Sequence, residues 1–188
     1  IVLLMPELLG TTLSALVDLS FLLAVAYALA KPILAIKQYR NLFFVPLLVM
    51  FTLANGEMHL ASAYPQSVSV NYSGYAGVLL VVFLMSVMAG RVVPMFTANG
   101  TQTTKATPAP LLDKLANGSL LLAMLMLLLH PFIGFVAMFF GAILIFAGIF
   151  QLVRWLRWRP WITLGAPLLW SLHFALKFVW FGLILLGF

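Results

Sequence analysis

The sequence contains no cysteine and very few charged residues. Of its 188 residues, 7% are charged, and only four are acidic against ten lysines and arginines. The missing cysteines exclude disulfides, thiolate metal sites and redox dithiols. A soluble globular domain carries about 25% charged residues, so a chain this poor in charge does not fit that class.

Apolar residues dominate instead, at 64% of the chain with a mean hydropathy of +1.15. Folding buries only part of the surface of a chain this short, so lipid must cover the remaining apolar side chains. A membrane-crossing helix needs about 20 mostly apolar residues. Six stretches qualify, at about 8–30, 42–63, 75–95, 111–130, 132–153 and 167–188. Because open strand edges are not tolerated in lipid, the sequence predicts an all-α fold, a single polytopic transmembrane bundle of six spans.

The lysines and arginines orient this bundle. Nearly all of them fall in alternate loops, within 31–40, 91–114 and 154–159. The positive-inside rule makes these loops cytoplasmic and places both chain ends outside. The net charge of +6 therefore indicates membrane orientation, and we expect no nucleic-acid partner. Because the first residue is Ile1 rather than methionine, we also expect the chain to be part of a larger protein.

Small and aromatic residues predict helix packing. Gly134, Gly141 and Gly148 recur every seven residues in the fifth span. Such spacing lines one helix face with glycine and lets a neighbouring helix approach closely. The three tryptophans within 155–161 predict an aromatic belt at the membrane interface. The stretch 97–110 is rich in threonine and proline and predicts an exposed loop.

Ionisable side chains inside the spans are costly in lipid and are therefore candidates for function. Asp18 in the first span and Lys177 in the sixth both lie near mid-membrane. A direct Asp18–Lys177 ion pair would explain why both are tolerated. The pair would act as a structural lock between helices or as part of a proton path.

Histidines inside the spans are candidate metal ligands, because neutral imidazole binds haem iron, copper and zinc. His59 lies near the outer end of the second span and His173 nearer the cytoplasmic end of the sixth, too far apart to share one metal. A hydrogen-bonded structural role is the alternative for each. His130 precedes Pro131 at the end of the fourth span and is better explained as a turn residue. Glu57 is close to His59 in sequence, but a separation of two residues directs the side chains to different sides of a helix. We expect Glu57 to serve a histidine on another helix, if it serves one.

Arg91 ends the third span. An arginine at this depth is suited to hold an anionic group such as a haem propionate through two parallel hydrogen bonds. Its long side chain can equally extend to the lipid headgroups. The sequence leaves both interpretations open.

One segment resembles a known family. The stretch Gly90–Gly100 resembles the glycine-arginine-x-x-proline-x-phenylalanine-threonine segment of the bacterial NnrS membrane proteins. Further stretches are similar to other parts of that family, namely Asn41–Leu47, Ala54-Asn55, His59-Leu60, Trp158–Pro160 and Pro167–His173. The family's histidine-rich N-terminal segment and its C-terminal histidine segment have no counterpart here.

The resemblance implies a haem- and copper-containing protein of the bacterial inner membrane, linked to nitric oxide and nitrosative stress. Family members have about twelve spans, so the chain would be a central portion. The resemblance suggests His59, His173 and Arg91 as cofactor-binding residues, with the two histidines as metal ligands. Its expected partners are membrane lipids, nitric oxide and other membrane subunits.

Two other functions remain open on the sequence. The first is a non-catalytic membrane scaffold or an accessory subunit of a larger respiratory-type complex, because so few ionisable groups are present. The second is a proton-coupled transporter that uses Asp18, Lys177 and Glu57. Transporters tend to show paired repeats with broken helices, and no such pairing is visible in the sequence.

Overall fold

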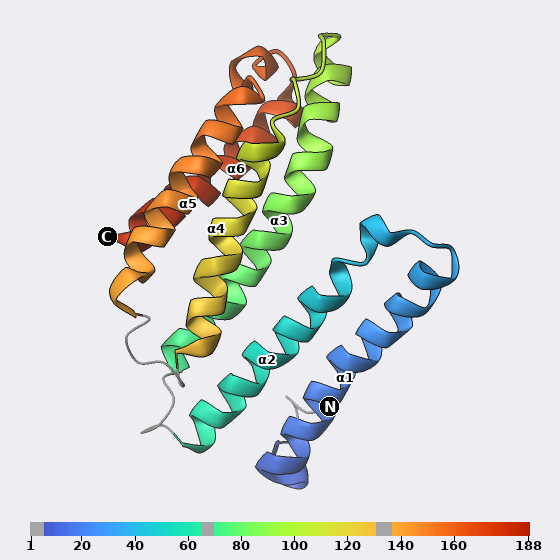
Figure 1. Ribbon diagram of the computed structural model, residues 1–188, viewed down its shortest axis with the longest axis vertical. Coiled ribbons are helices and arrows are strands. Elements are labelled where there is room, and N and C mark those ends of the chain that lie inside the picture. Colours follow the sequence, from blue (N-terminus) through green and yellow to red (C-terminus); the bar gives the residue numbers. More distant parts are fainter. Residues whose placement is uncertain (1–5, 65–69, 131–136) are drawn as a thin grey trace. The chain divides into compact units, whose positions relative to one another are not determined.

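The computed structural model describes residues 6–64, 70–130 and 137–188, and every regular element in these ranges is a helix (Figure 1). The long helices are α1 (Pro6–Ala35), α2 (Phe44–Ala63), α3 (Val70–Thr101), α4 (Pro110–Leu129), α5 (Ala137–Arg157) and α6 (Pro167–Gly187). Two short 3-10 helices, η1 (Tyr39–Asn41) and η3 (Pro160–Thr163), precede α2 and α6. All six long helices have the length and composition to cross a membrane. The predicted all-α membrane fold is confirmed.

Two helices continue through a proline near their predicted ends. The first span was expected to stop at Lys31-Pro32, but α1 reaches Ala35 with Pro32 inside it. Pro32 has no N–H to donate to the carbonyl one turn earlier, and its ring crowds that carbonyl. Because α1 ends three residues later, only its last turn is affected. The third helix likewise continues past Pro94, so Thr97 is helical and 5% exposed. The prediction that Thr97 begins an exposed loop was wrong, because Thr97 packs against α6.

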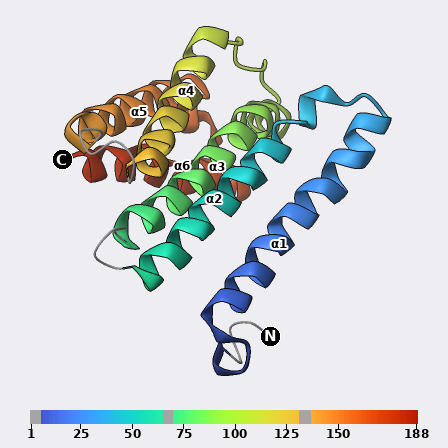
Figure 2. The same cartoon turned by 60° about the horizontal axis from the view of Figure 1, so that its bottom comes forward.

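The chain divides into two compact units, Ile1–Leu80 and Val81–Phe188. The first unit contains α1, α2 and the beginning of α3. Within it α1 and α2 pack side by side and run in opposite directions (Figures 1 and 2). This packing brings polar residues of α1 and α2 together inside a largely apolar pair of helices.

The second unit contains the rest of α3 with α4, α5 and α6, and α5 packs against both α4 and α6. Leu120, Met124 and Leu144 are fully buried in it. Trp158 packs against Ala89 and Val93 of α3 and is 8% exposed. This tryptophan therefore belongs to the core rather than to the predicted interfacial belt.

Glycines allow α5 and α6 to approach closely, as the sequence predicted for Gly141 and Gly148. A β-carbon at Gly141 would lie 2.6 Å from the Gly187 carbonyl oxygen, and one at Gly148 would lie 2.9 Å from the Trp180 carbonyl oxygen. Real β-carbons do not approach other atoms this closely, so larger residues would force the helices apart. Gly134 lies outside the described residues.

Gly148→Ala is expected to lower the free energy of unfolding by about 1–3 kcal/mol, the usual cost of overpacking a core. The control is Gly118→Ala on α4, where an added β-carbon meets nothing within 4 Å and alanine favours the helix. Equilibrium unfolding in mixed micelles measures both variants. Equal stability of the two variants would contradict the close approach of α5 and α6.

Candidate functional site

The first unit holds a polar cluster formed by Asp18 of α1 and two residues of α2. Asn55 and His59 are four residues apart and therefore lie on one face of α2. The Asn55 amide donates to Asp18 Oδ2 at 2.7 Å, and His59 Nε2 lies 3.1 Å from the same oxygen. The carboxylate thus connects the two helices. The side chains of His59 and Asp18 are 31% and 43% exposed.

These contacts change the interpretation of Asp18. The sequence paired it with Lys177 because an unpaired charge is costly in lipid, yet Asp18 has partners within its own unit. Lys177 lies in the second unit, where its Nζ is 5.5 Å from the Phe174 ring centroid, within range of a cation–π interaction. The Asp18–Lys177 pair would join the two units, and it stays a prediction.

The His59 imidazole has the surroundings expected of a metal ligand. Metal-binding histidines usually donate their second N–H to a carboxylate, a backbone carbonyl or water, which fixes the tautomer and raises the basicity of the ring. Asp18 is in this position, rather than Glu57, which is half-buried on α2. Within the described residues, the other nitrogen of His59, Nδ1, has no hydrogen-bond partner. The Nδ1 nitrogen of His59 is therefore available to bind a metal.

The donor set around His59 fits haem better than copper. A histidine that would hold haem iron needs one ring nitrogen without a hydrogen-bond partner, and among the described residues Nδ1 of His59 has none. A copper ion held by protein alone needs several ligands. Across the three described ranges, no three histidine, cysteine or acidic residues lie close enough to hold a metal ion. The described residues therefore do not form a copper site by themselves.

His173 lies inside the second unit and is 2% exposed. Its Nε2 hydrogen-bonds to Thr97 Oγ1 of α3 at 2.9 Å, and its backbone carbonyl accepts a hydrogen bond from Trp155 Nε1 at 2.9 Å. The other ring nitrogen, Nδ1, is buried and has no partner in the part of the chain that the structure describes. An unsatisfied buried polar atom costs about 1–3 kcal/mol, so a bound group or water is expected to satisfy it.

An apolar hollow of about 450 Å³ adjoins His173. Its walls come mainly from α5, η3 and α6. They include four aromatic residues, Trp155, Trp161, Trp170 and Phe174, and also Lys177. A flat apolar cofactor requires such walls. With the ring 2% exposed, however, His173 must shift before it can bind an iron atom in this hollow.

The Gly90–Gly100 segment lies on α3, with one face against α5 and α6. A β-carbon at Gly90 would overlap the Arg154 guanidinium, and one at Gly100 would lie 2.6 Å from Leu169 Cδ1. Thr97, between them, contacts His173. The segment that carries the family resemblance therefore positions side chains of α5 and α6. Arg91 is half-buried on this helix, and its role toward a propionate stays a prediction.

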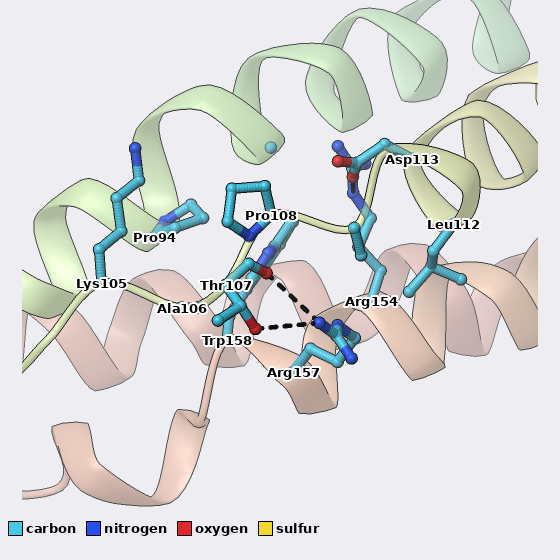
Figure 3. A pocket seen from close by; sticks show the side chains of 12 residues that line it. Pro94, Lys105, Ala106, Thr107, Pro108, Leu112, Asp113, Arg154, Arg157 and Trp158 are labelled. Carbon is cyan, nitrogen blue, oxygen red and sulfur yellow. Dashed lines mark hydrogen bonds and ion pairs between the residues drawn. The ribbon is translucent and has the colours of Figure 1, made fainter.

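Arg154 is an important site residue that sequence reasoning missed, because it was interpreted as a loop charge. It lies in the last turn of α5 and is 4% exposed. Its Nε donates to Asp113 Oδ1 of α4 at 2.6 Å, as Figure 3 shows. Its Nη1 donates to the Ser86 carbonyl and hydroxyl oxygens at 3.0 and 2.9 Å. One buried cation thus ties α3, α4 and α5 together.

Ser86 is the centre of a wider polar network. Its hydroxyl donates to Asn117 Oδ1 at 2.7 Å and accepts a hydrogen bond from Gln151 Nε2. Asp113 and Asn117 are spaced by one turn on α4, and Gln151 and Arg154 by nearly one turn on α5. Each pair therefore shares a helix face. This spacing was the sequence signal available for the network, although it does not reveal which faces meet.

Comparison with known proteins identifies a family for this chain. A family model described as NnrS protein matches residues 1–188. No curated protein and no solved structure matches the chain. The match covers the sequence from end to end, including the six apolar helices. The chain belongs to the NnrS family.

Proposed function

We propose that this membrane protein binds haem in the bacterial inner membrane and acts in the response to nitric oxide, with His59 as a residue that would hold the haem iron. The observation that carries the proposal is the Asp18–His59 pair, which holds one imidazole nitrogen at 3.1 Å and leaves the other available. Membership of the NnrS family supports the cofactor and the biological setting.

Each residue of the cluster has a defined task in this proposal. Asp18 fixes the tautomer and direction of the His59 ring, and Asn55 holds the carboxylate in place. Both groups come from rigid helices, so the imidazole is positioned before the cofactor arrives. Bound haem iron would supply a coordination position for nitric oxide. Whether nitric oxide is then sensed or converted depends on chemistry outside this cluster.

His173 is the second candidate ligand, supported by its unpartnered Nδ1 and by the aromatic hollow beside it. Arg91 is the candidate partner for a propionate of a haem bound by His173. Copper remains a proposed second cofactor on family grounds alone, since the described residues do not collect a ligand set for it. Membrane lipids and other membrane subunits are the proposed partners.

Replacing His59, the candidate iron ligand, tests the proposal. His59→Ala should reduce the haem content of the full-length protein about tenfold or more, because even loss of a residue that only supports a metal ligand costs 10–100-fold. His173→Ala is the parallel variant at the second candidate. The readout is Soret absorbance per protein after purification from its own membrane, with circular dichroism to verify the helical fold.

Full haem content in both variants, or no Soret band in the wild type, would remove the proposal. A scaffold or accessory subunit of a respiratory-type complex would then be the better account. One observation favours that alternative, namely the buried Arg154 network that ties three helices together. Such a network stabilises a bundle without any cofactor.

A further inference from the structure

A small basic pocket lies in the second unit, where the loop after α3 meets the start of α4 and the end of α5 (Figure 3). Its volume is about 120 Å³. Its charged lining residues are Lys105, Arg154 and Arg157 against Asp113. Three cations and one carboxylate give a formal net charge of +2, so the pocket attracts anions.

Arg154 presents part of its guanidinium without a protein partner. Its Nε and Nη1 are bonded to Asp113 and Ser86. Its Nη2 lies against Gly90 and has no hydrogen-bond partner among the described residues. The residue is 4% exposed, and charges interact more strongly at such sites than in bulk water. An anion that reached this donor would be held firmly.

The other two cations of the pocket are exposed. Arg157 Nη2 donates to the Thr107 carbonyl and hydroxyl oxygens at 3.3 and 3.2 Å, and Figure 3 shows this contact between α5 and the loop. Lys105 belongs to the same loop and is exposed. Helix α4 begins at Pro110 beside the pocket, and a helix N-terminus adds partial positive charge.

We propose that this pocket binds an oxyanion of the phosphate type, either as a free anion or as the phosphate group of a membrane lipid. Arginine and lysine are the usual partners of phosphate oxygens. The positive-inside rule places this end of α5 at the cytoplasmic surface, where basic pockets between helices bind anionic headgroups. The proposal is independent of haem binding at His59.

The test uses the whole protein in nanodiscs of phosphatidylcholine. One arm titrates inorganic phosphate by calorimetry. In the other arm phosphatidylglycerol is added to the nanodisc lipid, and its retention by the protein is measured by native mass spectrometry. Saturable binding in one arm is expected. Lys105→Gln and Arg157→Gln should weaken it about tenfold, because each removes a charged donor, whereas Lys105→Arg should retain it.

Matched controls remove the same charge outside the pocket. Lys114→Gln and Arg159→Gln change exposed residues that do not line it, and both should bind like the wild type. Phosphate binding without lipid retention identifies a free anion, and lipid retention alone identifies a headgroup. Absence of saturable binding in both arms, or equal weakening in pocket and control variants, overturns the proposal.

Discussion

Asp113→Ala is expected to lower the free energy of unfolding by about 3 kcal/mol, because Arg154 keeps its buried charge and loses the carboxylate bonded to its Nε. Removing one partner of a buried ion pair typically costs about 3–5 kcal/mol. The lower end applies because the Asp113 side chain is 44% exposed whereas that of Arg154 is 5% exposed. Unfolding in mixed micelles, followed by circular dichroism, measures the difference.

Two further variants distinguish loss of the ion pair from a general effect of substitution on stability. Asp113→Leu combined with Arg154→Met removes both charges, and it should be more stable than Asp113→Ala because no unpaired buried charge remains. Lys114→Ala changes the neighbouring exposed charge and should have little effect, as is usual for surface substitutions. If Asp113→Ala and Lys114→Ala proved equally stable, the ion pair would not contribute to the fold.

Asp18→Asn should weaken haem binding about 10–100-fold, the usual effect of losing a group that orients a metal ligand. Asparagine has nearly the size of aspartate but lacks the charge that holds the His59 ring. Asn55→Ala should have a smaller effect, since Asn55 contacts Asp18 and acts on His59 only through it. Titration of haem into the apo protein gives the affinities. Unchanged affinity in Asp18→Asn would show that the carboxylate does not support a ligand.

The membrane fold could be predicted from the sequence because a lipid bilayer sets few requirements for a segment that crosses it. A span must be long, apolar and helical, and six stretches meet those conditions. The ends of the helices were harder, since tertiary contacts decide them. Thr97 followed a proline in a threonine-rich stretch, yet its contact with His173 keeps it in α3.

The candidate site was predictable in its members but not in its pairings. Histidines and carboxylates stand out in an apolar chain, so His59 and Asp18 were both identified. Their mutual contact depends on how α1 and α2 are rotated against each other, which the sequence does not state. The sequence assigned Asp18 to Lys177, a pairing that stays a prediction, and it did not reveal the contacts of Asp18 with Asn55 and His59.

Arg154 was missed for a related reason. Hydropathy alone cannot distinguish a basic residue at the membrane surface from one in the buried last turn of a helix. Its burial depends on Gly90, which leaves room for the guanidinium, and on Asp113, which balances its charge. These two residues are distant from Arg154 in sequence, and they meet it only in the folded unit.

Chemical rescue of His59→Gly tests most directly whether His59 binds haem iron. The full-length variant, purified and mixed with haem, should lack the Soret band of the wild type because its donor nitrogen is missing. Added imidazole should restore the band, since it supplies the same nitrogen to the space that the side chain leaves. A His59→Gly protein that binds as much haem as the wild type, with an unchanged spectrum and no response to imidazole, would contradict the assignment.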